Sequence, residues 1–197
     1  MAQSRPINHS ELSECLFDQR VGTTGPGLSH ETRAQNILYT KYMKQKKQYW
    51  LMKSEPDEYS IDDLKRDKRA PWYGVRNYQA RNYMRDQMRV GDEVLFYHSS
   101  CPEPGVAGLA RVASAPYPDP TQFDKRSPYY DPKATQDKPR WMLVDVKFVR
   151  RFKRVVGLRV LRETKSLKHL IILRPGNRLS ITPVTWGECE TIEKLGS

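Results

Sequence analysis

Residues 141–152 carry the strongest strand pattern in the sequence, and this pattern limits the class of fold. One face of the predicted strand would carry Met142, Val144, Val146, Phe148 and Phe152. Alternation of this kind, with charged residues on the opposite face, is typical of a strand packed on a core. Shorter strand patterns occur at 49–53, 93–98 and 105–113, separated by few helical patterns. We therefore predict a mixed α+β domain built around an antiparallel or barrel-like sheet.

The helix signals are short and begin at polar capping residues. Ser60 precedes an acidic first turn, which predicts a helix over 60–65. Asn77 is a credible N-cap for a longer helix, whose core stripe would be Ala80, Met84 and Met88. Gly91, just after this helix, suits a left-handed position.

The C-terminal third gives weaker patterns. A short helix is predicted within 158–168, and strand candidates at 171–173 and 179–181 flank a Pro-Gly turn signal. Thr182-Pro183 is interpreted as the start of a last helix through Leu195. In the 105–113 strand, small residues such as Gly108 leave room for a bulky neighbour or a ligand.

Charge separates the chain into two parts. Residues 1–42 hold four basic and four acidic side chains, so the net charge of +11 belongs to residues 43–197. Residues 1–46 are interpreted as an extension, either a poorly ordered tail or an upstream segment that precedes a true start at Met43. Residues 47–197 form the predicted domain, and its basic character indicates an anionic partner, most often nucleic acid.

Cysteine spacing and hydropathy argue against several classes of protein. The three cysteines are widely spaced, with no C-x-x-C pair, which argues against a disulfide framework or a zinc site. No apolar run approaches the length of a membrane span. We predict a monomer without metal or cofactor, cytoplasmic in a bacterium or nuclear in a eukaryote.

A basic run indicates where phosphates would bind. Residues 147–168 hold nine basic side chains and one acid, Glu163. Such a run is often only a solvated strand face, but in a domain this basic it favours a phosphate-contacting surface. The predicted phosphate-binding residues are Arg85, Lys147, Arg150, Arg151, Lys153 and Arg154.

Two segments could recognise a base. Residues 72–83 combine four aromatics with arginine, asparagine and glutamine side chains, although a capped helix with a core tryptophan explains them equally well. Residues 53–56 read Lys-Ser-Glu-Pro, which places a donor and an acceptor beside a fixed turn. Such groups read the edge of a base, while Trp72 and Tyr97 could stack on its face. The alternative for 53–56 is ordinary turn chemistry with a surface ion pair.

Catalytic motifs are missing from the sequence: there is no phosphate loop, nucleophile elbow or dinucleotide fingerprint. His98 and Cys101 are a weak hint of a dyad. An enzyme would instead use Lys53 and Glu55, or His98. The enzyme hypothesis would be favoured by a lowered pKa at Lys53, with Glu55 in hydrogen-bond reach inside a closed pocket. A buried Trp72 with no cavity beside it would favour a plain nucleic-acid binder.

Several motifs together resemble the EVE domain family. The matching runs include residues 50–56 (WLMKSEP), 74–82 (GVRNYQARN), 96–100 (FYHSS) and 105–108 (GVAG), within about residues 48–195. The resemblance implies a PUA-like twisted β-barrel of five or six strands with short flanking helices, related to the YTH and ASCH domains. It also implies a reader of modified bases in DNA or RNA, with modified cytosines such as 5-methylcytosine preferred.

The same resemblance implies a base-binding pocket. Carried over by position, its residues are Lys53, Ser54, Glu55, Trp72, Val75, Arg76, Asn77, Gln79, Arg81, Tyr97, His98, Ser99 and Ser180. A small space near Gly108 or Val75 would accept the modification. An enzyme that acts on modified nucleosides or RNA, as ASCH relatives suggest, is the alternative function.

Overall fold

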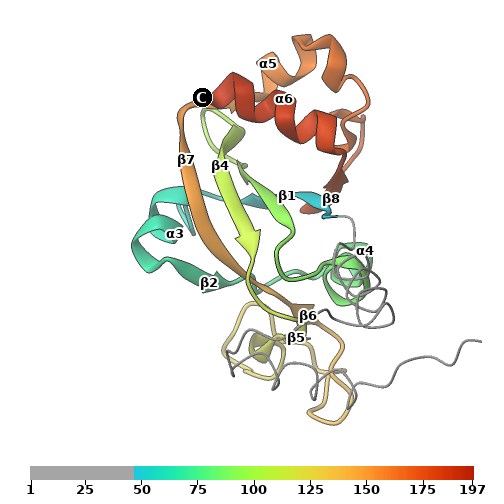
Figure 1. Cartoon of the computed structure of the whole chain (residues 1–197). Coiled ribbons are helices and arrows are strands. Elements are labelled where there is room, and N and C mark those ends of the chain that lie inside the picture. Colours follow the sequence, from blue (N-terminus) through green and yellow to red (C-terminus); the bar gives the residue numbers. More distant parts are fainter. Residues whose placement is uncertain (1–46) are drawn as a thin grey trace, which may run out of the picture. The chain divides into compact units, whose positions relative to one another are not determined.

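A mixed six-stranded sheet, curled into a half-barrel, is the centre of the computed structural model, which describes residues 47–197 (Figure 1). The strand order is β2-β7-β4-β3-β1-β8. These strands are β1 (Tyr49–Ser54), β2 (Arg69–Pro71), β3 (Glu93–His98), β4 (Gly105–Val112), β7 (Asp145–Gly157) and β8 (Ile181–Val184). The predicted extension, residues 1–46, lies outside the described residues. None of the described helices is long and apolar enough to cross a membrane.

The strand pairing explains why the middle of the sheet is buried on both sides. β1 pairs parallel with β3 and antiparallel with β8, whereas β4 pairs antiparallel with both β3 and β7. Alternate residues of β3 point into two separate cores: Val94 and Phe96 into the first, Leu95 and Tyr97 into the second. The strands predicted at 49–53, 93–98 and 105–113 are confirmed. The single strand predicted over 141–152 is divided into β6 (Met142–Leu143), which belongs to a separate two-stranded sheet, and β7, which begins at Asp145.

Short helices cover the first core. α3 (Ile61–Asp67) follows its predicted capping residue, Ser60, and the structure shows a capping box in which Ser60 and Asp63 exchange hydrogen bonds. α4 (Tyr78–Asn82) continues into a π-helical turn, η2 (Tyr83–Gln87). Asn77 caps α4 by accepting hydrogen bonds from the backbone N–H groups of Gln79 and Ala80.

The predicted core stripe of this helical segment is confirmed, because Ala80, Met84 and Met88 are fully buried in the first core. Gly91 also adopts the left-handed region that the sequence suggests, with φ of +100°. The second core lies on the opposite face of the sheet. It is covered by α5 (Leu158–Glu163), η4 (Lys165–Leu167) and α6 (Trp186–Gly196).

Three local predictions are wrong. Residues 182–183 do not open the last helix: they lie in edge strand β8, where a proline is tolerated, and Thr185 caps α6. Residues 171–173 form a 3₁₀ turn, η5 (Ile171–Leu173), not a strand. Phe152 packs in the second core, because register shifts between β4 and β7 move it off the face that carries Val146.

The space predicted beside Gly108 is filled by protein. A Cβ atom at this position would lie 2.5 Å from the Arg150 carbonyl oxygen and 3.0 Å from Ile61 Cγ1. Gly108 therefore allows β7 and α3 to approach β4 closely, and no ligand fits there. The long loop between β4 and β7 contains β5 (Tyr117–Pro118), η3 (Pro120–Gln122) and β6 (Met142–Leu143).

Candidate functional site

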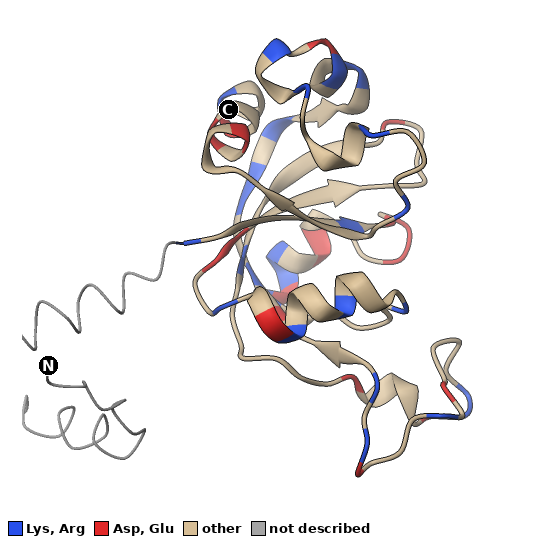
Figure 2. Cartoon of the chain, turned by 90° about the vertical axis from the view of Figure 1, so that its right-hand side faces the viewer, with Lys and Arg blue, Asp and Glu red and all other residues tan. Residues whose placement is uncertain are grey.

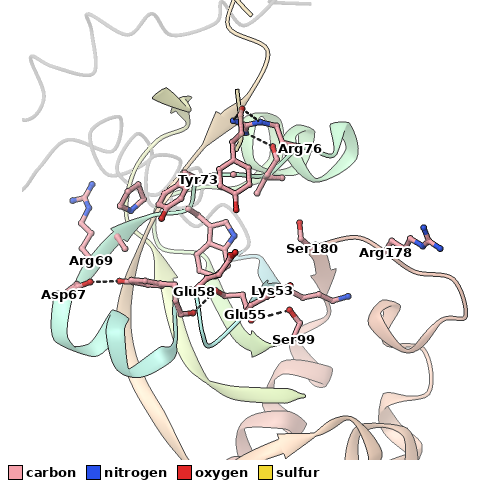
Figure 3. Close-up of a pocket in the computed structure, with 18 residues that line it drawn as sticks. Lys53, Glu55, Glu58, Asp67, Arg69, Tyr73, Arg76, Ser99, Arg178 and Ser180 are labelled. Atoms are coloured by element: carbon pink, nitrogen blue, oxygen red, sulfur yellow. Dashed lines mark hydrogen bonds between the residues drawn. The ribbon is translucent and has the colours of Figure 1, made fainter. Parts of the chain in front are cut away.

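A cavity of about 600 Å³ opens at the end of β1, against β2 and the segment that follows it. This volume falls within the usual range for small-ligand sites. Figure 3 shows its lining side chains, which come from several separate parts of the chain. Of the predicted pocket residues, those in its wall are Lys53, Ser54, Glu55, Trp72, Val75, Arg76, Ser99 and Ser180.

Trp72 forms an apolar part of the wall. It follows β2 directly, and its backbone N–H donates to the Val144 carbonyl at 2.9 Å. The indole packs edge-on against Phe96, with ring centroids 5.4 Å apart, and is only 8% exposed. Among residues 47–197, no acceptor lies within hydrogen-bond distance of the Trp72 indole N–H. The remaining exposed surface of this side chain and its indole N–H are therefore available to a ligand in the cavity.

Arg76 lines the cavity, but all of its donors are used within the protein. Its guanidinium donates to the Tyr129 carbonyl from both Nε and Nη2. It also donates to Asp119 Oδ2 at 2.8 Å, to Thr121 Oγ1 at 2.9 Å and to the Val75 carbonyl at 3.3 Å. Because a guanidinium has five N–H groups, none is left for a base. Arg76 therefore holds the 119–129 loop in place.

The carboxylate that pairs with Arg76 is buried. Asp119 is 1% exposed and accepts four hydrogen bonds, including one from the Gly74 backbone N–H at 3.0 Å. Burial alone would raise the pKa of Asp119, but hydrogen bonds from Thr121, Arg76 and Gly74 outweigh burial and hold this pKa below its usual range. Asp119 is thus a charged anchor for this wall.

Tyr129 completes the same wall, and the sequence did not point to it. Its ring lies against Gly74, where an added Cβ would come within 2.7 Å of Tyr129 Cζ, and it faces Tyr73 edge-on at 6.2 Å. The guanidinium of Arg76 lies 5.4 Å from the Tyr129 ring centroid. Tyr73 and Tyr129 both line the cavity. Tyr129 lies in the long loop between β4 and β7, and loops of this length in a compact domain are usually functional or mobile.

The opposite wall is formed by the end of β1 and the segment before β8. The Lys53 backbone N–H donates to the Ser180 carbonyl at 2.8 Å, which joins the two segments. The Lys53 ammonium makes no hydrogen bond or ion pair with any residue in the range 47–197, and burial lowers its pKa below the usual value. Arg178, exposed and without such a partner in the same range, lines the cavity beside it. This wall presents unused donors.

The rest of the Lys-Ser-Glu-Pro motif makes turn contacts. Ser54 Oγ donates to the Tyr59 carbonyl at 2.7 Å, and the Ser99 N–H donates to the Ser54 carbonyl at 2.9 Å. Glu55 accepts a hydrogen bond from Ser100 Oγ at 2.8 Å. No ion pair within 4.0 Å joins Lys53 to Glu55 in this part of the chain. The contacts of Ser54 and Glu55 agree with the alternative of ordinary turn chemistry, but Lys53 and Glu55 do not form an ion pair with each other.

Five predicted pocket residues lie away from the cavity wall. Tyr97 packs in the second core, on the other face of the sheet, and is 3% exposed. His98 Nε2 accepts a hydrogen bond from the Ile61 N–H at 3.1 Å, and burial lowers its pKa. Asn77 is used as the cap of α4, and the Gln79 side chain donates to Tyr83 Oη. These four side chains, which the resemblance implies for the pocket, therefore lie outside the wall of this cavity.

Arg81, the fifth, belongs to a stacked cluster next to α4. Its guanidinium donates to the Arg140 carbonyl at 2.7 Å and lies 4.9 Å from the Tyr78 ring centroid. Tyr78 stacks on Trp141 with ring centroids 4.9 Å apart. Burial, with Arg85 nearby, lowers the pKa of Arg81. These contacts explain the position of the Arg81 side chain without a bound base.

The predicted phosphate-binding residues are mostly paired and none lines the cavity. Arg150 pairs with Glu193 at 2.7 Å, Arg151 with Asp62 at 3.5 Å and Arg85 with Asp86 at 2.7 Å. Arg154 donates to the Leu195 carbonyl at 3.0 Å. Lys147 and Lys153, the two lysines of the set, are exposed and form no ion pair within the described part of the chain.

A group of possible metal ligands lies under α6. One donor atom from each of Glu93, Cys189 and Glu193 falls within 4.8 Å of the others. Glu93 is already paired with Lys47, and Glu193 with Arg150. Burial and the two glutamates raise the pKa of the Cys189 thiol, which disfavours the thiolate that a metal needs. We interpret the group as an ion-pair network.

The half-barrel and its cavity define a class of domain, and a comparison with known families identifies it. The EVE domain model matches residues 48–195, so the chain belongs to the EVE domain family. Human thymocyte nuclear protein 1 is 42% identical over 172 residues, 78% of this chain and 76% of the relative. The family resemblance and the fold predicted from the sequence are confirmed.

Solved structures of similar proteins agree with this family assignment. A Pseudomonas syringae protein is 52% identical with a TM-score of 0.73, covering 76% of this chain and 99% of that one. The human THYN1 protein, in complex with DNA that contains 5-methylcytosine, is 43% identical with a TM-score of 0.71. That match covers 76% of this chain and 97% of the human chain.

Proposed function

We propose that this chain is a non-catalytic nucleic-acid-binding module that reads a modified base, a modified cytosine, in the cavity beside Trp72. The observation that carries the proposal is the cavity of about 600 Å³, with an aromatic wall and unused donors in one place. A related EVE protein has been crystallised with DNA containing 5-methylcytosine, which supports the same partner here.

The geometry suggests how reading would proceed. A base that leaves its stack costs a few kcal/mol, and contact with aromatic walls returns roughly 1–3 kcal/mol. Trp72, Tyr73 and Tyr129 supply these walls, and the Trp72 indole N–H and the Lys53 ammonium supply donors to the base edge. Since Gly108 is packed by protein, buried Val75 is the remaining candidate to contact an added methyl group.

The alternative of an enzyme is less well supported. The lowered pKa of Lys53 fits one part of that hypothesis, but Glu55 is bonded to Ser100 and does not pair with Lys53 within residues 47–197. A general base must lie within hydrogen-bond reach of its partner. The alternative of a pocketless binder is also disfavoured, since Trp72 is buried beside a cavity.

The proposal is tested by fluorescence anisotropy with oligonucleotides that differ at one cytosine: unmodified, 5-methyl or 5-hydroxymethyl, each as DNA and as RNA. We expect one modified strand to bind more tightly than its unmodified match. Trp72→Ala should abolish this preference and should raise the Kd of the preferred strand about 5- to 150-fold, because stacking contributes roughly 1–3 kcal/mol. Trp72→Leu keeps apolar volume if the alanine variant unfolds.

The matched control is Trp186→Ala, which removes a 62% exposed tryptophan on α6 that does not line the cavity. It should retain the preference. Equal binding of all probes by the wild type, or a preference that survives in both Trp72 variants, would contradict the proposal.

A further inference from the structure

A second basic surface, distinct from β7, lies on the segment that leads into the cavity. Residues 158–178 hold six basic side chains and a single acid, Glu163. The basic residues are Arg159, Arg162, Lys165, Lys168, Arg174 and Arg178, and all are exposed. The one ion pair found here among the described residues joins Arg159 to Glu163 at 3.7 Å, with both side chains largely solvated, so it contributes little.

The charges of this segment are less compensated than those of β7. On β7, the three predicted arginines are held by acidic side chains or a backbone carbonyl of neighbouring elements. A paired arginine must give up its partner before it can neutralise a phosphate. Figure 2 shows Lys and Arg along β7 and again over the helical turns at the top of the view.

The segment is held firmly to the domain despite its charge. Leu161, Leu167 and Leu170 are buried in the second core and fix α5, η4 and the turn that follows. Successive backbone hydrogen bonds, from the Leu167 N–H to the Thr164 carbonyl and from the Leu170 N–H to the Leu167 carbonyl, connect the turns. The cations therefore stand on an ordered frame, which reduces the entropy lost when they bind a polyanion.

This frame ends at the cavity. Asn177 ties the last turn to η5 through a hydrogen bond from its Nδ2 to the Ile171 carbonyl at 3.2 Å. The next residues, Arg178 and Ser180, line the cavity itself. Figure 3 shows the long side chains of Arg178 and Lys53 extending to the same side of the cavity. The basic surface and the candidate base site are thus continuous in the chain and meet at Arg178.

From this continuity we propose that residues 158–178 bind the phosphates next to the nucleotide whose base enters the cavity. This inference rests on the proposed function, because it presumes that a nucleotide places its base in the cavity. The nucleic-acid strand on either side of that nucleotide would then lie on this surface. Neutralised phosphates release counterions, so each contact adds about 0.9 to the slope of log affinity against log salt. Phosphate contacts fix position and carry no information about the base.

The test compares two triple variants of the full chain with equal loss of charge. The first, R162Q/K165Q/K168Q, removes exposed cations of the segment. The control, K125Q/K133Q/K138Q, removes exposed cations of the loop between β4 and β7. Both are titrated with the duplex DNA probes, 5-methylcytosine and unmodified, over a series of salt concentrations.

We expect the first variant to lower the salt slope by roughly two to three and to weaken both probes by the same factor. The control should keep the wild-type slope. An unchanged slope in the first variant, or an equal fall in both variants, would overturn the proposal. Failure of the proposed function is distinct, because it appears as a wild-type ratio of one between the probes.

A third arm separates nucleic acid from another polyanion. Vesicles of phosphatidylcholine and phosphatidylserine in equal parts are titrated with the wild type and the first variant. Vesicle binding that the first variant abolishes, with an unchanged DNA slope, would assign the surface to a membrane and overturn the proposal. Weak vesicle binding with the DNA slope lowered as expected supports it.

Discussion

The two walls of the cavity are both cationic, but they differ in what their donors already contact. On the loop side, Arg76 spends all five N–H groups on Asp119, Thr121, Tyr129 and Val75. On the β1 side, the Lys53 ammonium has no such partner within the described residues. A side chain with saturated donors is structural, whereas a half-buried charge that has no partner among the described residues is available for a ligand. The cavity therefore has one supporting wall and one candidate binding wall.

The largest effect is expected on the supporting wall. Arg76→Ala leaves the Asp119 carboxylate, 1% exposed, without its cation. Removing one member of a buried pair costs about 3–5 kcal/mol, so we expect a loss of that order in the free energy of unfolding. Urea unfolding followed by tryptophan fluorescence measures it.

Two variants show whether the pairing is the cause. Arg76→Lys keeps the charge but not the five-donor geometry, so its loss should be smaller than that of the alanine variant. Asp119→Asn in the Arg76→Ala background removes the stranded charge and should recover part of the loss. A change below about 1 kcal/mol in Arg76→Ala, the size of a surface pair, would mean that Arg76 does not hold this wall.

A medium effect is expected at Gly74, where the same wall meets Tyr129. Gly74→Ala forces a left-handed φ of +80° on alanine, which costs about 1–2 kcal/mol. It also brings a Cβ within 2.7 Å of Tyr129 Cζ. We expect a total loss of roughly 2–3 kcal/mol in the free energy of unfolding.

The matched control is Gly176→Ala, at φ of +73° with no atom within 4 Å of the new Cβ. It should show the backbone cost alone, so the difference between the two variants reports the contact with Tyr129. In a Tyr129→Ala background, the loss in the free energy of unfolding caused by Gly74→Ala should fall to that of Gly176→Ala. Equal losses at both glycines would show that Tyr129 is free to move away, and that this wall is softer than its hydrogen bonds indicate.

The sequence predicted the strands well, because their signal is local. The alternation in 141–152 reports the two faces of a strand wherever its partners lie. The start of α6 was misplaced because Thr182-Pro183 carries a helix signal, while pairing of β8 with β1 makes it a strand. Phe152 was placed on the wrong face because a register shift depends on the partner strand.

The site was predicted less completely, because its roles depend on distant residues. Arg76 was identified as a pocket residue, but apart from the adjacent Val75 carbonyl its acceptors lie 43 to 53 positions away, so sequence patterns could not show that its donors are used. The family resemblance implies that Tyr97 and His98 belong to the pocket, although both lie within the predicted 93–98 strand. Strand alternation directs Tyr97 to the second core, and His98 serves as an acceptor for α3.

The smallest effect on stability, and the sharpest contrast between the walls, is expected at Lys53. Lys53→Met keeps the unbranched stem and removes a charge whose pKa burial lowers. Because the unfolded chain binds more protons than the native state between the lowered pKa and the usual value of 10.5, wild-type stability rises with pH across that window. The variant lacks this rise.

At neutral pH the variant should therefore be as stable as the wild type or slightly more so, within about 0.5 kcal/mol. Binding of the preferred modified probe should nevertheless weaken roughly tenfold or more, since a hydrogen bond from a charged donor contributes about 1.5–3 kcal/mol. Urea unfolding at several pH values and anisotropy at one pH give the two readouts. If Lys53→Met lost stability as Arg76→Ala does, or bound the probe as tightly as the wild type, Lys53 would be structural too, and a binding wall would have to be sought around Arg178.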